Sequence, residues 1–136
     1  MNRILIDSGP LIALFDASDK YHQKSIKFIK HNISSLITTI ASITEVLHLL
    51  DFNRNAQIDF LAWVAQGGVQ LFDIKQEDLP RIKELTVKYQ DLPMDFADSC
   101  LVLLAERTGI NTIVTIDRDF TIYRINGEKT FETIML

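Results

Sequence analysis

Short runs of hydrophobic residues alternate along this chain with longer stretches in which hydrophobic and polar positions recur at helical spacing. The short runs predict strands over residues 3–7, 34–40, 69–74 and 110–117, with a short fifth strand over 129–136. The longer stretches predict helices over residues 9–19, 20–31, 41–52, 55–68, 77–90 and 93–109. Strands that alternate with helices predict an α/β fold, here a mostly parallel central sheet of four to five strands flanked by helices in an α/β/α sandwich.

Two of the predicted strands end in an aspartate. Asp7 follows the apolar run Ile4–Ile6, and Asp117 follows the fourth strand in the same way. In a parallel sheet the carboxyl ends of the strands meet at one edge, where α/β folds bind their ligands. The alternative for Asp7 is that it only caps the helix that follows it.

A second pair of acids lies at the start of the most apolar predicted helix. Asp95 and Asp98 are three residues apart, so they share a helix face. They can form an ordinary acidic first turn, with Asp95 as the N-cap, or they can face the edge of the sheet. In the second case their mutual repulsion requires a counter-charge.

Glu45 lies within another apolar helix. Ser42 and His48 are its polar neighbours at helical spacing. This narrow polar stripe either faces solvent or directs the glutamate inward toward the other acids, and the sequence leaves both interpretations open.

The four carboxylates Asp7, Glu45, Asp98 and Asp117 point to a metal ion if they converge. Carboxylates that lie within a few ångströms of one another raise one another's pKa values, and a bound divalent cation removes that repulsion. Oxygen ligands select Mg²⁺ or Mn²⁺, and a Cys/His ligand set for zinc is missing because the three histidines are spread along the chain. Carboxylate-bound Mg²⁺ is suited to phosphoryl transfer.

Composition narrows the classes of protein further. The chain has 136 residues, of which 47% are hydrophobic, and its formal net charge is −4. One globular domain is expected, and bulk electrostatic attraction to nucleic acid is not. The start does not resemble a signal peptide, no run is long enough for a membrane span, and the one cysteine, Cys100, lies in an apolar stretch. We therefore expect a cytoplasmic protein with a buried thiol.

Four segments, in order, resemble the acidic motifs of PIN-domain ribonucleases, and most of all those of VapC-type toxins of toxin–antitoxin pairs. They are IDSGPLIALFD, SITEVLHLL, MDFADSCLVLLAERTGI and VTIDRDF, and together they span nearly the whole chain. The resemblance implies a single PIN-like domain over residues 1–136. It also implies a Mg²⁺-dependent endoribonuclease, with Mn²⁺ as a possible substitute.

The resemblance assigns roles to particular residues. Asp7 and Asp98 would be the principal metal ligands, Glu45 would bind a second ion or orient the attacking water, and Asp117 would complete the metal pocket. Asp95 would support the ligands from behind, and Thr115 would hydrogen-bond a carboxylate of the pocket. Asp119 is assigned to the turn that follows the fourth strand. Whether one or two ions bind is left open.

The resemblance also implies partners. Members of this family commonly form homodimers, and the toxins bind an antitoxin that blocks the site. RNA would be the substrate. Lys20, Lys24, Lys27 and Lys30 recur at helical spacing and can follow a phosphate backbone, although a solvated helix face would look the same.

Other phosphate-handling folds fit less well. A haloacid-dehalogenase-like phosphatase needs a second acid two residues after the first, and Gly9 occupies that position. A receiver domain needs paired early acids, an aspartate at a strand end and a late lysine. Asp73 lies near a strand end, but the paired acids and a suitable lysine are missing. An inactive PIN-like interaction module would have lost an acid, whereas all four positions are filled. A PIN nuclease in RNA processing outside toxin–antitoxin systems remains an alternative.

Overall fold

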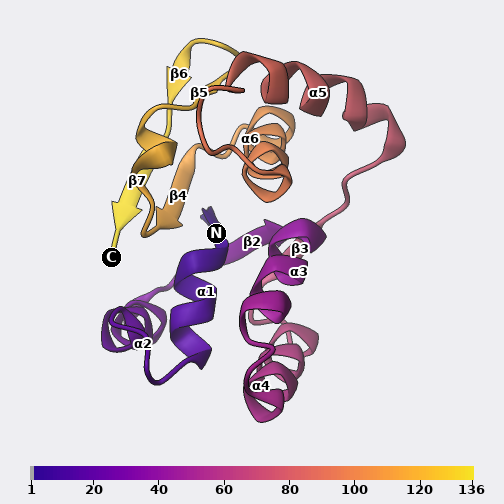
Figure 1. The fold of residues 1–136 in the computed structure, drawn as a ribbon. Helices are drawn as coiled ribbons and strands as arrows, with labels where there is room; N and C mark the ends of the chain where they lie inside the picture. The colour runs from indigo at the N-terminus through magenta and orange to yellow at the C-terminus, as the bar shows by residue number, and fades with distance from the viewer. Residues whose placement is uncertain (1) are drawn as a thin grey trace.

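The computed structural model describes residues 2–136, and its centre is a parallel sheet of five strands (Figure 1). In spatial order the strands are β3 (Gln70–Phe72), β2 (Ser35–Thr39), β1 (Arg3–Ile6), β4 (Thr112–Thr115) and β7 (Glu132–Met135). All neighbours in this order pair in parallel. Because β1 is central, β2 and β4 flank it directly and the carboxyl ends of all three strands lie at one edge of the sheet.

Helices cover both faces of the sheet. In Figure 1, the helices from the first half of the chain lie on one side of the sheet and the later helices lie on the other. They are α1 (Ser8–Phe15), α2 (His22–His31), α3 (Ile40–Leu49), α4 (Arg54–Ala65), α5 (Leu79–Lys88) and α6 (Phe96–Thr108). The predicted α/β/α sandwich with a parallel sheet is confirmed.

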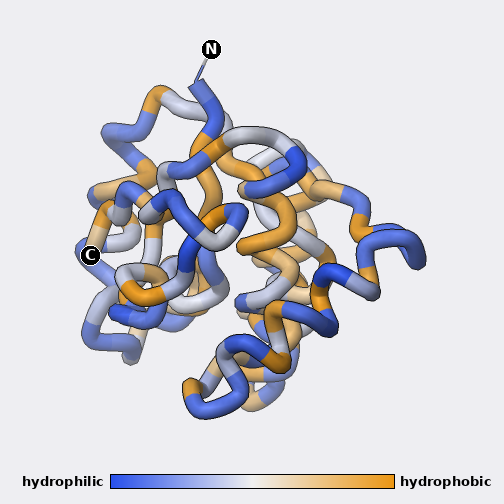
Figure 2. Tube along the Cα trace, turned by 90° about the horizontal axis from the view of Figure 1, so that it is seen from above, coloured by the Kyte–Doolittle hydropathy of each residue, from blue (hydrophilic) through white to orange (hydrophobic). Residues whose placement is uncertain are grey.

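The sheet separates two hydrophobic cores. Leu5 and Ile113 pack with α5 and α6 on one face, whereas their chain neighbours Ile4, Ile6 and Val114 pack with α1, α3 and α4 on the other. This alternation follows from the two-residue period of a strand. Figure 2 shows hydrophobic residues on the inner strands and helix turns and hydrophilic residues on the outer loops. Each fully buried Leu or Ile contributes roughly 1.5–3 kcal/mol, which fixes the sheet as a rigid support.

The structure differs from the predicted elements near the C-terminus. The run 129–136 does not form one strand: β6 (Lys129–Thr130) pairs antiparallel with β5 (Arg124–Ile125), and only β7 joins the central sheet. Asn126 and Gly127 connect β5 and β6 with positive φ angles of 54° and 73°. Both residue types tolerate this left-handed backbone. Tyr123, the residue before β5, is buried in the same core as Leu5 and Ile113.

Two short 3₁₀ turns, Gln76–Asp78 and Arg118–Thr121, complete the described chain. Cys100 is buried in α6, as its apolar surroundings in the sequence predicted. Of the helices formed by residues 2–136, none combines the length and the apolar character that a bilayer span requires.

Candidate active site

A hollow of about 700 Å³ opens at the edge of the sheet where β1 and β4 end. Its wall carries seven carboxylates, contributed by segments far apart in the sequence. They are Asp7, Asp19, Glu45, Asp95, Asp98, Asp117 and Asp119. The four acids that were predicted to converge therefore do line one cavity.

Asp7 is held at the tip of β1 by both its main chain and its side chain. The Asp7 N–H donates to the Val114 carbonyl across the β1–β4 pair at 3.0 Å. Its side chain caps α1 by accepting the Ser8 N–H at 2.8 Å, and it accepts the Thr115 hydroxyl at 3.0 Å. Burial raises the pKa of Asp7 to about 6, although the two hydrogen bonds partly oppose the shift. The capping role and a place in the hollow are thus compatible.

Asp95 and Asp98 form the start of α6. Asp95 is the N-cap and accepts the Asp98 N–H at 2.8 Å, while the Asp95 N–H approaches Asp98 Oδ2 at 3.5 Å. The Tyr123 hydroxyl donates to Asp98 Oδ2 at 3.2 Å. Burial raises the pKa of Asp98 to about 8, and the charges of Asp7 and Asp95 add to the shift. As with Asp7, the two interpretations are compatible, because Asp95 and Asp98 form the first turn of α6 and also line the hollow.

Glu45 turns inward from α3. The Ser8 hydroxyl donates to Glu45 Oε1, which links the start of α1 to the middle of α3. Burial raises the pKa of Glu45 to about 7, and the neighbouring Asp95 carboxylate adds to the shift. The polar stripe of α3 is divided, because His48 is exposed and Ser42 is buried. The structure therefore places Glu45 among the other acids and not on a solvent-facing stripe.

Asp117 and Asp119 form the rim beyond β4. Asp117 is exposed and accepts the Asp119 N–H at 3.1 Å, while its own N–H donates to the Thr115 hydroxyl at 2.9 Å. Thr115 thus connects Asp7 to Asp117. Asp119 lies in the turn after β4, as expected, but it also lines the hollow. Burial and the adjacent Asp117 raise the pKa of Asp119.

Two side chains that the sequence analysis did not single out touch these acids. Ser8 holds Glu45, and its position directly after Asp7 at a helix start was the available signal. Tyr123 holds Asp98 from 25 residues away. It belongs to an aromatic cluster with Tyr89 and Phe120, and nothing in its local sequence marks it.

The hollow lacks a cationic partner from the described chain. In residues 2–136, ion pairs form between Arg81 and Glu84, Arg81 and Glu106, and Arg107 and Asp78, and none involves the seven acids of the hollow. Burial and neighbouring carboxylates raise the pKa values of Asp7, Glu45 and Asp98, and none of these ion pairs opposes the shifts.

The donor set of the hollow suits a hard divalent cation by its chemistry, since every candidate ligand is a carboxylate oxygen. As the side chains lie, however, no three His, Cys, Asp or Glu residues of the described sequence are close enough to hold a metal ion together. Asp95 and Asp117 are exposed, so they are the carboxylates with room to adjust. The cavity therefore fits a cation in donor type and charge, and its carboxylates are not gathered around one point.

The comparisons with known proteins agree with this architecture. Ribonuclease VapC26 of Mycobacterium tuberculosis is 28% identical over 134 residues, which cover 96% of this chain and 99% of that protein. The crystal structure of M. tuberculosis VapC20, a sarcin-ricin loop cleaving toxin, has the same fold with a TM-score of 0.79 at 17% identity, covering 95% of this chain and 97% of that one. The PIN domain family matches residues 4–126. The resemblance that the four motifs indicated is confirmed, and the chain belongs to the PIN domain family.

Proposed function

We propose that this protein is a Mg²⁺-dependent endoribonuclease that acts as the toxin of a toxin–antitoxin pair. The observation that carries the proposal is that seven carboxylates line one hollow that contains no cationic side chain of the described chain. Similarity to VapC26, a ribonuclease by name, and the fold shared with VapC20, a sarcin-ricin loop cleaving toxin, support the choice of RNA as substrate.

Asp7 and Asp98 are the side chains that we assign to the cation. Both are buried at the base of the hollow, and Thr115 and Tyr123 fix their orientations through hydrogen bonds. Asp117 and Asp95 complete the negative wall. A bound Mg²⁺ ion would supply Lewis-acid stabilisation of the phosphate charge and a more acidic water.

Glu45 is the side chain that we assign to the attacking water. Its pKa of about 7 allows it to accept a proton near neutral pH, and Ser8 restrains its rotation. The water oxygen would bond to phosphorus as one ester oxygen leaves with the electron pair of the broken bond, and the proton from the water would pass to Glu45. Asp95 would stay out of the reaction and hold the start of α6 in place.

A cleavage assay tests the proposal. We expect purified protein to cut a labelled single-stranded RNA with Mg²⁺ or Mn²⁺ and to lose this activity in EDTA. Asp98→Asn should reduce cleavage by more than about 100-fold, because even residues that only support metal ligands cost 10–100-fold when they are replaced. Asp59→Asn, an exposed acid on α4, is the matched control and should have no effect. Equal cleavage in EDTA would contradict the metal mechanism.

The biological part of the proposal has its own test. A toxin should arrest growth when it is expressed in a bacterium, and Asp98→Asn should abolish the arrest at equal protein level. An antitoxin encoded beside this protein should restore growth and bind the purified chain, in the cytoplasm where both are made. Growth unaffected by active protein would favour a PIN nuclease of RNA processing instead.

A homodimer, which the family resemblance implies, can be measured by light scattering of the purified protein.

A further inference from the structure

Two further hollows adjoin the acidic hollow in sequence, and the last of them lies against α2. The next one, of about 570 Å³, shares Tyr21 and Ile116 with the acidic hollow and adds Arg118 and Thr121. The third, of about 600 Å³, shares Met135 and Leu136 with the second. The shared lining residues place the three hollows next to one another, in this order, along the surface.

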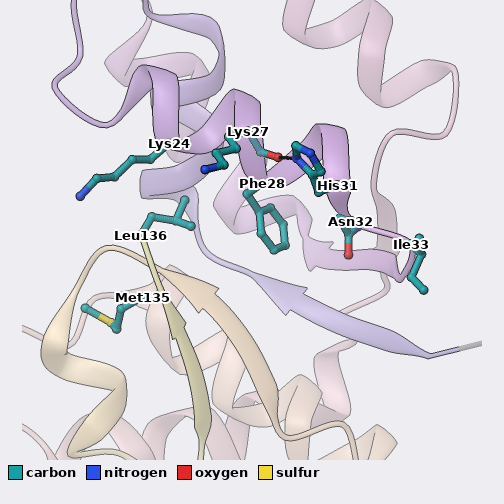
Figure 3. A pocket seen from close by; sticks show the side chains of 8 residues that line it. All are labelled: Lys24, Lys27, Phe28, His31, Asn32, Ile33, Met135 and Leu136. Atoms are coloured by element: carbon teal, nitrogen blue, oxygen red, sulfur yellow. Dashed lines mark hydrogen bonds between the residues drawn. The ribbon is translucent and has the colours of Figure 1, made fainter.

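The side chains that line the hollows change from acidic to basic and apolar with distance from the acidic hollow. The third hollow is lined by Lys24, Lys27, Phe28 and His31 of α2, opposite the end of β7 (Figure 3). In Figure 3, the Phe28 ring extends from the helix toward the strands, and His31 is bonded to the Lys27 carbonyl. Neither the second nor the third hollow has an Asp or Glu side chain among its described lining residues, although the chain as a whole is acidic.

Aromatic and cationic side chains are paired at the junction. Tyr21 stands between the acidic hollow and the second one, and its ring has the Lys20 Nζ at 5.1 Å and the Lys24 Nζ at 5.7 Å from its centroid. The Tyr21 N–H donates to Asp19 at 2.8 Å, which fixes the residue just before α2. The Tyr21 ring and the ammonium groups over it bring an aromatic surface, which a base can contact, and cationic groups, which a phosphate can contact, to one place.

We propose that this row of hollows, which we call the α2 track, holds the single-stranded RNA that flanks the cleaved bond. Phosphates would lie near Lys24, Lys27 and Arg118, and bases would lie against Tyr21 and Phe28. The inference rests on the proposed nuclease function and extends it to how the substrate is held. Each nucleotide carries one negative charge and one flat apolar face, which is the combination that these walls offer.

An acidic peptide is the competing occupant, because it too would be attracted by the lysines. The position beside the acidic hollow favours RNA. A polyanionic peptide has no reason to approach seven carboxylates, whereas a substrate strand must pass from the reacting phosphate to a place that compensates its charge. Of the four lysines at helical spacing, Lys24 and Lys27 line the third hollow, whereas Lys20 and Lys30 are exposed and do not line it.

Binding of RNA without cleavage tests the α2 track. The full chain carrying Asp98→Asn, in EDTA, is titrated into a fluorescein-labelled 12-nucleotide RNA that lacks self-complementarity, and Kd is measured by anisotropy over a range of salt concentrations. In that background, Lys24→Gln with Lys27→Gln should lower the slope of log Kd against log salt by about 1.4, since each phosphate contact of a single strand contributes about 0.7. The matched control, Lys30→Gln with Lys83→Gln, removes the same charge from other surfaces and should leave the slope unchanged.

The aromatic residues have a separate readout. Phe28→Leu preserves most of the apolar packing under α2 and removes the ring. The Kd for RNA should therefore rise about tenfold, and the slope of log Kd against log salt should not change. Tyr21→Leu should act in the same way, and it keeps the test decisive if Phe28→Leu unfolds. Circular dichroism of each variant checks that it is folded.

Two results would overturn the α2 track. One is an equal change in the salt slope of Kd for the Lys24/Lys27 double variant and for the Lys30/Lys83 control. The other is that polyglutamate displaces the labelled RNA as effectively as unlabelled RNA of equal charge does. That result would indicate a docking surface for an acidic protein. The Kd pattern does not depend on cleavage. A protein that shows the pattern but never cuts RNA with Mg²⁺ would contradict only the nuclease proposal, and one that cuts RNA without the pattern would contradict only the track.

Discussion

Two aspartates of this protein share a local structure and differ in what surrounds them. Asp78 and Asp98 are 1% and 7% exposed, and each accepts, or is approached by, the backbone N–H of the residue three positions earlier at the start of a helix. Arg107 donates to Asp78 Oδ1 at 2.6 Å. Asp98 has no such cation and faces two other carboxylates instead. Where an aspartate serves the fold alone, this chain supplies a counter-charge from within.

The same contrast runs along α6. Near its C-terminal end, Glu106 receives two hydrogen bonds from Arg81 at 2.8 Å each. Burial alone would raise the pKa of Glu106, but these bonds and the Asn126 N–H lower it. At the N-terminal end, burial and like charges raise the pKa of Asp98 to about 8. The difference indicates that the acidic hollow is arranged for a charge that comes from outside the chain.

The largest expected effect is an opposite change in stability when each aspartate loses its charge. In EDTA at pH 8, Asp98→Asn should raise Tm by about 3–5 °C, roughly 1 kcal/mol for a chain of this size, because it removes a repelled carboxylate. Asp78→Asn should lower the free energy of unfolding by about 2 kcal/mol, because Arg107 loses its ionic partner. Thermal melts of both variants measure the difference, and a clear loss of stability in Asp98→Asn would reduce that residue to a helix cap.

The gain in Asp98→Asn has a defined pH dependence. The folded-state pKa of Asp98 lies near 8, above the value of about 3.8 expected in the unfolded chain, so the folded state holds the extra proton between these limits. Its contribution to stability is complete below about pH 4 and is lost as the pH rises through 8. The metal-free protein should therefore become less stable from pH 5 to pH 8, and the melts should show a shallower decline for Asp98→Asn.

A smaller effect is expected from Tyr123→Phe, which removes the hydroxyl that positions Asp98. Since the hydrogen bond from Tyr123 lowers the pKa of Asp98, its loss should move the acidic limb of the pH–rate profile to higher pH and reduce cleavage about tenfold. Tyr89→Phe is the matched control, because that hydroxyl bonds to the Arg124 N–H in the same aromatic cluster without touching the acids. Identical pH–rate profiles for both variants and the unmodified protein would contradict the positioning role.

Much of this architecture could be predicted from the sequence because it is encoded locally. The apolar run before Asp7 and the run before Asp117 mark strand ends, and parallel order then brings the two acids to one edge. The sequence of the α3 helix did not decide the direction of Glu45, because its polar stripe could face either solvent or the other acids. The packing of α3 against α1 decides it, since this packing brings Ser8 to Glu45.

The remaining parts depend on contacts between distant segments. Tyr123 reaches Asp98 from the segment between β4 and β5, and no periodic pattern in the sequence marks that contact. Asp119 belongs to its turn and to the hollow at once, and the sequence indicates only the first. The α2 track also required the structure, since the spacing of the lysines could not distinguish Lys30 from Lys24 and Lys27.

Binding of Mn²⁺, measured by calorimetry in buffers of different ionisation enthalpy, tests most directly whether the hollow exchanges protons for a cation. The account predicts that Mn²⁺ binds, that protons are released as it binds, and that affinity rises between pH 6.5 and pH 8 as Asp7, Glu45 and Asp98 lose their protons. Asp7→Asn combined with Asp98→Asn should abolish the binding. Binding that is independent of pH, or that survives this double substitution, would contradict the account.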